Sequence, residues 1–206
     1  MNIGAPIESI NLIQDIGIVE SSDMKFSNHC SFIASKAHSC SYLLLESFIS
    51  NDFKLLIKAY KVYVRPIIES FNSVWNSHLL KDIRRLEKVQ KSFNRSVCKR
   101  YRIPYKDYSL RLNIFNLESR ESRRTKFDLV MSYKIMHNLV DLPFSEFFTF
   151  VPFYYPARCH AQKHYSSIKC KNYTGRFLYC ERIIKIWNSL FDYIVYSSTL
   201  SLFKSN

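Results

Sequence analysis

The chain has 206 residues, a net charge of +13 at pH 7, 47% apolar residues and 16% aromatic residues. So large an apolar fraction excludes global disorder and fits one domain, or two small ones, around a buried core. The three glycines, Gly4, Gly17 and Gly175, include no pair at the spacing of a phosphate-cradling loop, which argues against a nucleotide site of that kind.

The first predicted element is a short strand region at residues 9–19, where apolar and polar residues alternate up to a break at residues 15–17. A helix should follow to about residue 48, with Ser27 or Asn28 as its cap. Asp52 should cap the next helix, which we expect to reach residue 75 and to be kinked or restarted at Pro66.

The most informative segment is the predicted helix at residues 79–99. Residues 81–111 contain eleven Lys or Arg and three acids, which gives this segment a net charge of +8. At about 100° per residue, six of the cations fall within an arc of roughly 80°. These six residues are Lys81, Arg84, Lys88, Lys91, Arg95 and Lys99. The opposite side of the helix is apolar and contains Leu79, Ile83, Leu86, Val89, Phe93 and Val97.

Two interpretations of this basic stripe remain open at the level of sequence. It is either a solvated outer face or a surface that binds a polyanion. Like charges four residues apart destabilise an isolated helix, and acids are almost absent from the stripe. Both observations favour polyanion binding, and nucleic acid is the polyanion that such a face most commonly meets.

The C-terminal half should begin after a break at Pro104, with a short helical piece at residues 108–112. We expect a long amphipathic helix at residues 118–139. Its predicted core positions are Phe127, Val130, Met131, the stem of Lys134, Ile135 and either Asn138 or Leu139. Residues 144–176 are rich in aromatics without a helical period. Two helices should close the chain, one at residues 178–190 and one capped by Ser197 or Ser198.

These elements predict a mainly α protein: a helical bundle with a short N-terminal strand region and an irregular aromatic-rich segment before the C-terminal helices. No run of about 18 uncharged apolar residues occurs, so we expect no membrane span. The N-terminus lacks a basic-then-apolar signal segment, which predicts an intracellular protein of the nucleus or cytoplasm.

No enzymatic chemistry is predicted for the chain. No two acidic residues are adjacent, and adjacent acids are the simplest way to build the metal site of a polymerase or nuclease.

One group of residues could be considered as zinc ligands: Cys159, His160, His164, Cys170 and Cys180. Because Cys170 and Cys180 are too far apart for a local ligand pair, we expect no zinc and no other cofactor. The six cysteines include no CxxC pair and are interpreted as reduced thiols.

Several stretches in order resemble the region downstream of the catalytic motif in reverse transcriptases of jockey-like non-LTR retrotransposons. The N-terminal half contributes Asp15-Ile16-Gly17-Ile18, Asp23-Met24-Lys25-Phe26-Ser27-Asn28-His29, Lys36-Ala37, Ala59-Tyr60-Lys61, Val64-Arg65-Pro66-Ile67-Ile68-Glu69, Val74-Trp75 and Leu86-Glu87-Lys88-Val89-Gln90. The C-terminal half contributes Arg111-Leu112, Leu117-Glu118-Ser119-Arg120, Arg123-Arg124, Asp128-Leu129, Tyr133-Lys134-Ile135-Met136, Arg158-Cys159-His160, Ile186-Trp187-Asn188-Ser189-Leu190 and Phe203-Lys204.

The resemblance implies that the chain corresponds to the thumb and C-terminal extension of an RNA-directed DNA polymerase. Residues 1–26 would end the palm-like strand region, residues 27–140 would form the helical thumb, and residues 141–206 the C-terminal extension. The family's aromatic-Ala-Asp-Asp catalytic motif would lie upstream of Met1. We therefore expect a truncated, non-catalytic copy of this transposable-element enzyme without a small-molecule substrate.

The thumb of such a polymerase grips the template–primer duplex, so the implied partner is the backbone of an RNA–DNA hybrid or a DNA duplex, bound without regard to sequence. Two alternatives stay open. The chain could be a degenerate fragment without binding function, or an independent basic nucleic-acid-binding regulator.

Overall fold

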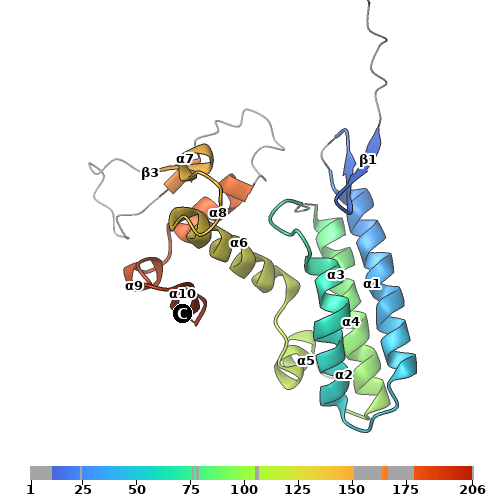
Figure 1. Cartoon of the computed structure of the whole chain (residues 1–206). Coiled ribbons are helices and arrows are strands. Elements are labelled where there is room, and N and C mark those ends of the chain that lie inside the picture. The colour runs from blue at the N-terminus through green and yellow to red at the C-terminus, as the bar shows by residue number, and fades with distance from the viewer. Residues whose placement is uncertain are drawn as a thin grey trace, which may run out of the picture. The chain divides into compact units, whose positions relative to one another are not determined.

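The computed structural model in Figure 1 describes residues 11–23, 25–75, 77, 79–104, 107–150, 164–166 and 179–205. As predicted, the protein is mainly helical and has a short antiparallel strand pair near its N-terminus. The chain forms two compact units, Met1–Ser70 with Ser77–Leu117 and Phe71–Asn76 with Glu118–Asn206. This division does not test the domain boundaries predicted after residues 26 and 140, which stay a prediction.

The first unit begins with a β-hairpin. Strands β1 (Leu12–Asp15) and β2 (Ile18–Ser21) pair antiparallel, with Asp15 opposite Ile18. The two residues of the turn have φ angles of 46° at Ile16 and 81° at Gly17. Tight hairpins favour positive φ at both turn positions, because this backbone matches the twist of the strands. The predicted strand break is therefore confirmed as a hairpin turn.

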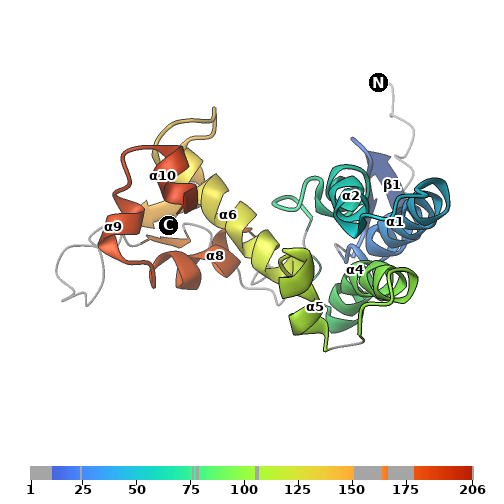
Figure 2. The same ribbon diagram turned by 90° about the horizontal axis from the view of Figure 1, so that it is seen from below.

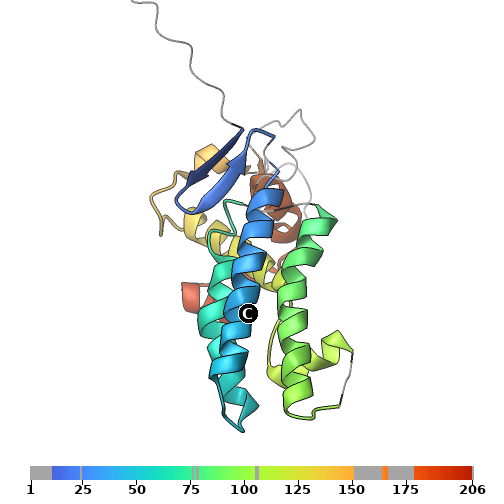
Figure 3. The ribbon, with the colours of Figure 1, turned by 90° about the vertical axis from the view of Figure 1, so that its right-hand side faces the viewer.

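Long helices packed side by side make up the body of the first unit (Figure 3). They are α1 (Ser27–Ser47), α2 (Phe53–Ala59) with its continuations η1 (Tyr60–Val64) and α3 (Arg65–Glu69), and α4 (Leu80–Arg100). Small buried residues on α1, among them Ala34 and Ala37, leave room for close helix packing. Between η1 and α4 the rings of Tyr60 and Phe93 stack with centroids 4.5 Å apart, and aromatic pairs of this kind stabilise a core beyond their buried area.

The second predicted helix is confirmed at its start and at its restart. Asp52 Oδ1 accepts a hydrogen bond of 2.8 Å from the Lys54 amide, which caps α2. The helix is π-helical over η1 and returns to α-helix with Pro66 in the first turn of α3, where proline is tolerated. Its predicted end at residue 75 is wrong. The helix ends at Glu69 because the chain turns there, with φ of 54° at Phe71.

The predicted cap of α1 is also wrong, although its boundaries are confirmed. Phe26 occupies the N-cap position of α1, and no side chain caps the helix. The Ser27 hydroxyl is engaged elsewhere, since it donates to Asp82 Oδ2 at 2.6 Å. A tertiary hydrogen bond has thus taken the side chain that the sequence offered as a local cap.

The last helix of the first unit is α5 (Tyr108–Phe115), which is longer than the piece predicted there. Asp107 caps it by accepting from the Ser109 amide at 3.1 Å. The helix ends at Asn116, which has a left-handed φ of 47°, a conformation that asparagine tolerates better than most residues.

The second unit is built on α6 (Arg120–Met136), against which α8 and α10 pack (Figure 2). Among the described residues its other elements are α7 (Phe144–Phe147), β3 (Phe148–Phe150), β4 (His164–Ser166), α8 (Tyr179–Trp187), α9 (Asp192–Val195) and α10 (Leu200–Ser205). Strands β3 and β4 pair antiparallel. The remainder of the predicted irregular segment, residues 151–163 and 167–176, lies outside the described residues.

The buried face of α6 differs in phase from the prediction. Ile135 is buried as expected, but Phe127 is 40% exposed and Leu139 is 54% exposed. Polar Asp128 and Ser132 are buried instead. Hydrophobicity alone does not predict the buried face of α6, because Asp128 and Ser132 are buried through hydrogen bonds to Arg182 and Tyr179 of α8.

Two small hydrophobic clusters form the core of the second unit. One contains Tyr133, Trp187, Val195 and Phe203, and the other contains Ile135, Phe148, Cys180 and Ile183. The Tyr133 hydroxyl donates to the Ser197 carbonyl oxygen at 2.7 Å. The predicted cap of the final helix is shifted, because Thr199 rather than Ser197 or Ser198 accepts from the Leu202 amide.

Candidate nucleic-acid interface

The basic stripe of six residues predicted from the sequence lies along the outer side of α4. Lys81, Arg84, Lys88, Lys91, Arg95 and Lys99 are all exposed. The other side of the helix is buried against the rest of the first unit and includes Leu86, Val89, Phe93 and Val97. At 1.5 Å per residue, the stripe extends for about 27 Å along the helix axis.

Not every cation of the basic segment is available to a partner. Arg85 donates to the Ser31 hydroxyl and pairs with Asp82 at 3.3 Å. Arg100 donates to backbone carbonyl oxygens near the end of α1, including that of Phe48 at 3.1 Å. Arg111 is only 3% exposed. Arg85 and Arg100 thus bond within the first unit and Arg111 is buried, which the count of charges in the sequence does not reveal.

Asp82 anchors the first turn of α4, a structural role that the sequence alone does not indicate. Its carboxylate is fully buried and accepts from the hydroxyls of Ser27 at 2.6 Å and Ser77 at 3.0 Å, as well as from Arg85. A buried carboxylate is tolerated when its oxygens are satisfied in this way. From the sequence alone, Asp82 is simply one of the three acidic residues in the basic segment 81–111.

Four members of the stripe project without a side-chain partner. Within the described ranges, the side chains of Lys81, Arg84, Arg95 and Lys99 make no hydrogen bond or ion pair. Lys88 lies near His38 of α1, and the pKa of His38 is lowered by burial first and by the Lys88 charge second.

Lys91 is held differently, by an aromatic ring from α5. Its ammonium lies 4.8 Å from the centroid of Tyr108, a cation–π contact. The Tyr108 hydroxyl donates to Glu87 and accepts from Gln90 Nε2 at 3.0 Å. Burial, followed by the hydrogen bond to Glu87, raises the pKa of Tyr108, so the phenol stays neutral at physiological pH. No spacing in the sequence indicates that Tyr108 would meet α4.

The geometry of the stripe suits a charged backbone better than a base edge. Flexible lysines and arginines on one exposed face can each reach a phosphate, and such contacts carry no sequence information. Removal of condensed counterions from the nucleic acid would then drive binding.

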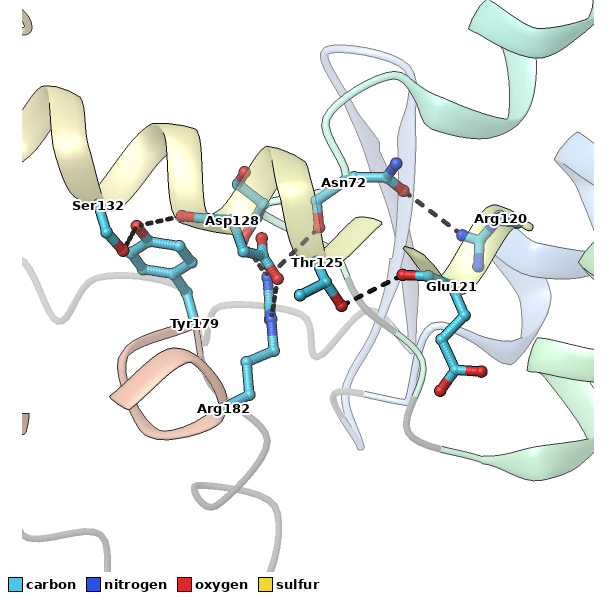
Figure 4. A network of polar contacts seen from close by, with 9 residues as sticks. Asn72, Arg120, Glu121, Thr125, Asp128, Ser132, Tyr179 and Arg182 are labelled. Carbon is cyan, nitrogen blue, oxygen red and sulfur yellow. Dashed lines mark hydrogen bonds and ion pairs between the residues drawn. The ribbon is translucent and has the colours of Figure 1, made fainter. Parts of the chain in front are cut away.

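A second polar cluster lies in the second unit and joins α6, α8 and the segment Phe71–Asn76 (Figure 4). Arg182 holds Asp128 through two bonds, Nε to Oδ2 at 2.8 Å and Nη2 to Oδ1 at 3.0 Å. Its Nη2 also donates to the Ser73 carbonyl oxygen at 3.2 Å. Arg120 donates to Asn72 Oδ1 at 3.4 Å and covers the Trp75 ring.

This cluster has a structural role. Trp75, Arg120 and Asp128 are each less than 5% exposed, so they have little surface to offer a partner. Several residues that carry the family resemblance, including Trp187, are likewise buried. Trp75, Arg120, Asp128 and Trp187 are thus interior residues of the second unit, whereas the basic stripe of α4 is exposed.

Two further expectations concern metals and membranes. In the part of the chain that the structure describes, His, Cys, Asp and Glu form no group of three or more that could hold a metal ion. Cys159, His160 and Cys170 of the weighed zinc set lie outside that part, so the absence of zinc stays a prediction. No helix among the described residues is both long and apolar enough to cross a bilayer.

Comparison with known proteins gives little guidance. The chain is 25% identical over 130 residues to an uncharacterized protein of Caenorhabditis elegans, and the match covers 63% of this chain and 64% of that protein. The chain thus spans less than two thirds of the length of this relative. No family model matches the sequence. No solved structure matches it either.

Proposed function

We propose that this chain is related to the reverse transcriptases of jockey-like non-LTR retrotransposons and corresponds to their thumb and C-terminal extension. In this proposal α4 grips the sugar-phosphate backbone of a template–primer duplex, an RNA–DNA hybrid or DNA, in the nucleus or cytoplasm. The ordered series of sequence motifs supports the family. The binding role rests on one observation, the exposed basic stripe opposite the buried face of α4.

The proposal assigns binding to this chain and no catalytic step. A phosphoryl-transfer site needs carboxylates close together to hold its metal ions, and the acids of this sequence are dispersed. We therefore expect the purified protein to incorporate no nucleotides on a primed template with Mg²⁺ or Mn²⁺.

The test is the salt dependence of binding to a short duplex, measured by fluorescence anisotropy. If all six cations contact phosphates, the slope of log K against log salt concentration approaches about −5 for a B-form duplex. Changing Arg84, Lys88 and Arg95 together to Gln should make the slope shallower by about 2 to 3 and weaken binding to unrelated sequences equally. This triple variant spares Lys91, which contacts Tyr108.

A matched control removes the same charge from elsewhere in the first unit. Lys36, Lys54 and Lys58 are exposed on α1 and α2, and changing all three to Gln should leave the slope close to that of the unchanged protein. Equal slopes for the stripe variant and the unchanged protein would refute the proposal. If both triple variants lose the same amount of affinity, the binding depends on the net charge of the protein and not on the basic stripe.

A further inference from the structure

Helix α6 has a second face that the polar cluster does not use. Arg123, Lys126, Phe127, Val130 and Lys134 recur at helical spacing and fall within an arc of about 100°. This face is turned roughly 135° from the buried face that carries Asp128 and Ile135. The helix therefore presents one side to the core and another, basic and partly apolar, side to a cavity.

The cavity has a volume of about 550 Å³ and lies between α6, Leu190 just before α9, Ile194 within α9, and α10, all in the second unit. Five of its lining residues, called here the floor, are apolar: Leu129, Val130, Leu190, Ile194 and Phe203. Four others, called here the rim, are cationic: Arg123, Lys126, Lys134 and Lys204. Small-molecule pockets are typically about 300–1,000 Å³, mostly apolar, with a few polar groups that fix orientation.

The rim cations differ in how far their charge is already neutralised. Lys126 pairs with Glu118 at 2.8 Å, and the Arg123 guanidinium lies 5.4 Å from the Phe127 ring centroid. The side chains of Lys134 and Lys204 make no hydrogen bond or ion pair within the described residues. Two cations that line a largely apolar cavity thus remain open to an anion.

The chain itself offers little to neutralise them. Residues 151–178 contain five Lys or Arg and no Asp or Glu, so this stretch has the same sign of charge as the rim. Charge complementarity therefore favours a ligand from outside the chain. The cavity volume of about 550 Å³ lies within the range typical of small-molecule pockets, which favours a small molecule as the ligand.

We propose that this cavity binds a monomeric anionic amphiphile, with its carboxylate at Lys134 and Lys204 and its alkyl chain on the apolar floor. Apolar burial supplies affinity, and the two ammonium groups select the charge of the head group. The site shares no residue with the basic stripe of α4 and does not depend on the function proposed for that stripe.

Calorimetric titration with octanoate tests the proposal on the full chain. We expect saturable one-to-one binding of octanoate and none of octyltrimethylammonium, which has the same chain and the opposite charge. Changing Lys134 and Lys204 to Gln should weaken octanoate binding about tenfold or more, since the carboxylate loses both charge-assisted hydrogen bonds. Val130→Phe, which fills part of the floor, should weaken it independently.

The matched control changes Lys58 and Lys185 to Gln. Both are exposed and outside the cavity lining, so octanoate affinity should not change. The proposal is overturned if octanoate does not bind, if the cation binds equally well, or if the Lys134 and Lys204 variant binds like the unchanged protein. Binding to anionic phospholipid vesicles without binding to octanoate would also overturn it, in favour of a membrane surface.

Discussion

At the scale of single residues, His29 of α1 is linked to the N-terminal hairpin by a hydrogen bond that its imidazole ring accepts. The Val19 amide donates to His29 Nδ1 at 3.3 Å, and the side chain is 3% exposed. Burial lowers the pKa of His29 below its ordinary value near 6.5. Protonation would turn Nδ1 into a donor facing another donor, so the folded protein favours the neutral ring.

We predict that the free energy of unfolding falls as the pH drops below about 6.5. A histidine with a lowered folded-state pKa binds protons more readily when unfolded, so its stabilising contribution is complete above the unfolded pKa and is lost with acidification. His38, whose pKa burial also lowers, acts with the same sign. Urea unfolding between pH 7.5 and about pH 5 measures the effect.

His29→Asn separates the two histidines. The amide oxygen of Asn can replace Nδ1 as an acceptor but does not titrate. This variant should therefore show a flatter pH profile in the same range, with the remaining slope due to His38. An unchanged pH slope in the variant would mean that His29 is not responsible.

At the scale of elements, α4 combines a buried face that stabilises it with an outer face that does not. Like charges recur three or four residues apart along the basic stripe, for example at Arg84 and Lys88 and at Arg95 and Lys99. Each such pair costs about 0.2–0.5 kcal/mol in an isolated helix. A merely solvated face would more commonly intersperse acids among these cations.

We predict that changing Arg84 and Arg95 together to Gln raises the free energy of unfolding by about 1 kcal/mol at low salt. The change removes four like-charge pairs, and neither side chain has a partner in the described part of the chain. In about 1 M salt the difference should vanish, because screening removes the repulsion. Lys91→Gln gives the contrast: it also removes two like-charge pairs but loses the Tyr108 ring, so it should not raise stability. A loss of stability in the double variant would mean that these arginines are structural.

The elements also show what the sequence could predict. The phase of α4 followed from helical periodicity, because apolar and basic residues segregate cleanly around it. The phase of α6 did not, because Phe127 is exposed while Asp128 is buried against Arg182, a partner 54 residues away in the chain. The sequence does not show that Arg85 and Arg100 bond to α1 and its C-terminal end or that Arg111 is buried, because these contacts depend on tertiary packing.

At the scale of the whole molecule, the two compact units are interleaved along the chain. The chain passes between them after Ser70, before Ser77 and after Leu117. The connection between α3 and α4 thus belongs to the second unit, where Arg120 and Arg182 bind Asn72 and Ser73. No local pattern around residues 71–76 predicts this, because the partners lie about 50 and 110 residues later in the sequence.

We predict that Trp75→Ala destabilises the second unit, although Trp75 lies between α3 and α4 in the sequence. The ring is fully buried beneath the Arg120 guanidinium, and removing a buried tryptophan costs about 3–5 kcal/mol. Native-state hydrogen exchange should therefore lose protection in α6 and α8 before α1 and α4. Val74→Ala, at a neighbour that is 61% exposed, should change neither unit. If α1 and α4 lose protection first, the prediction is wrong and residues 71–76 stabilise the first unit instead.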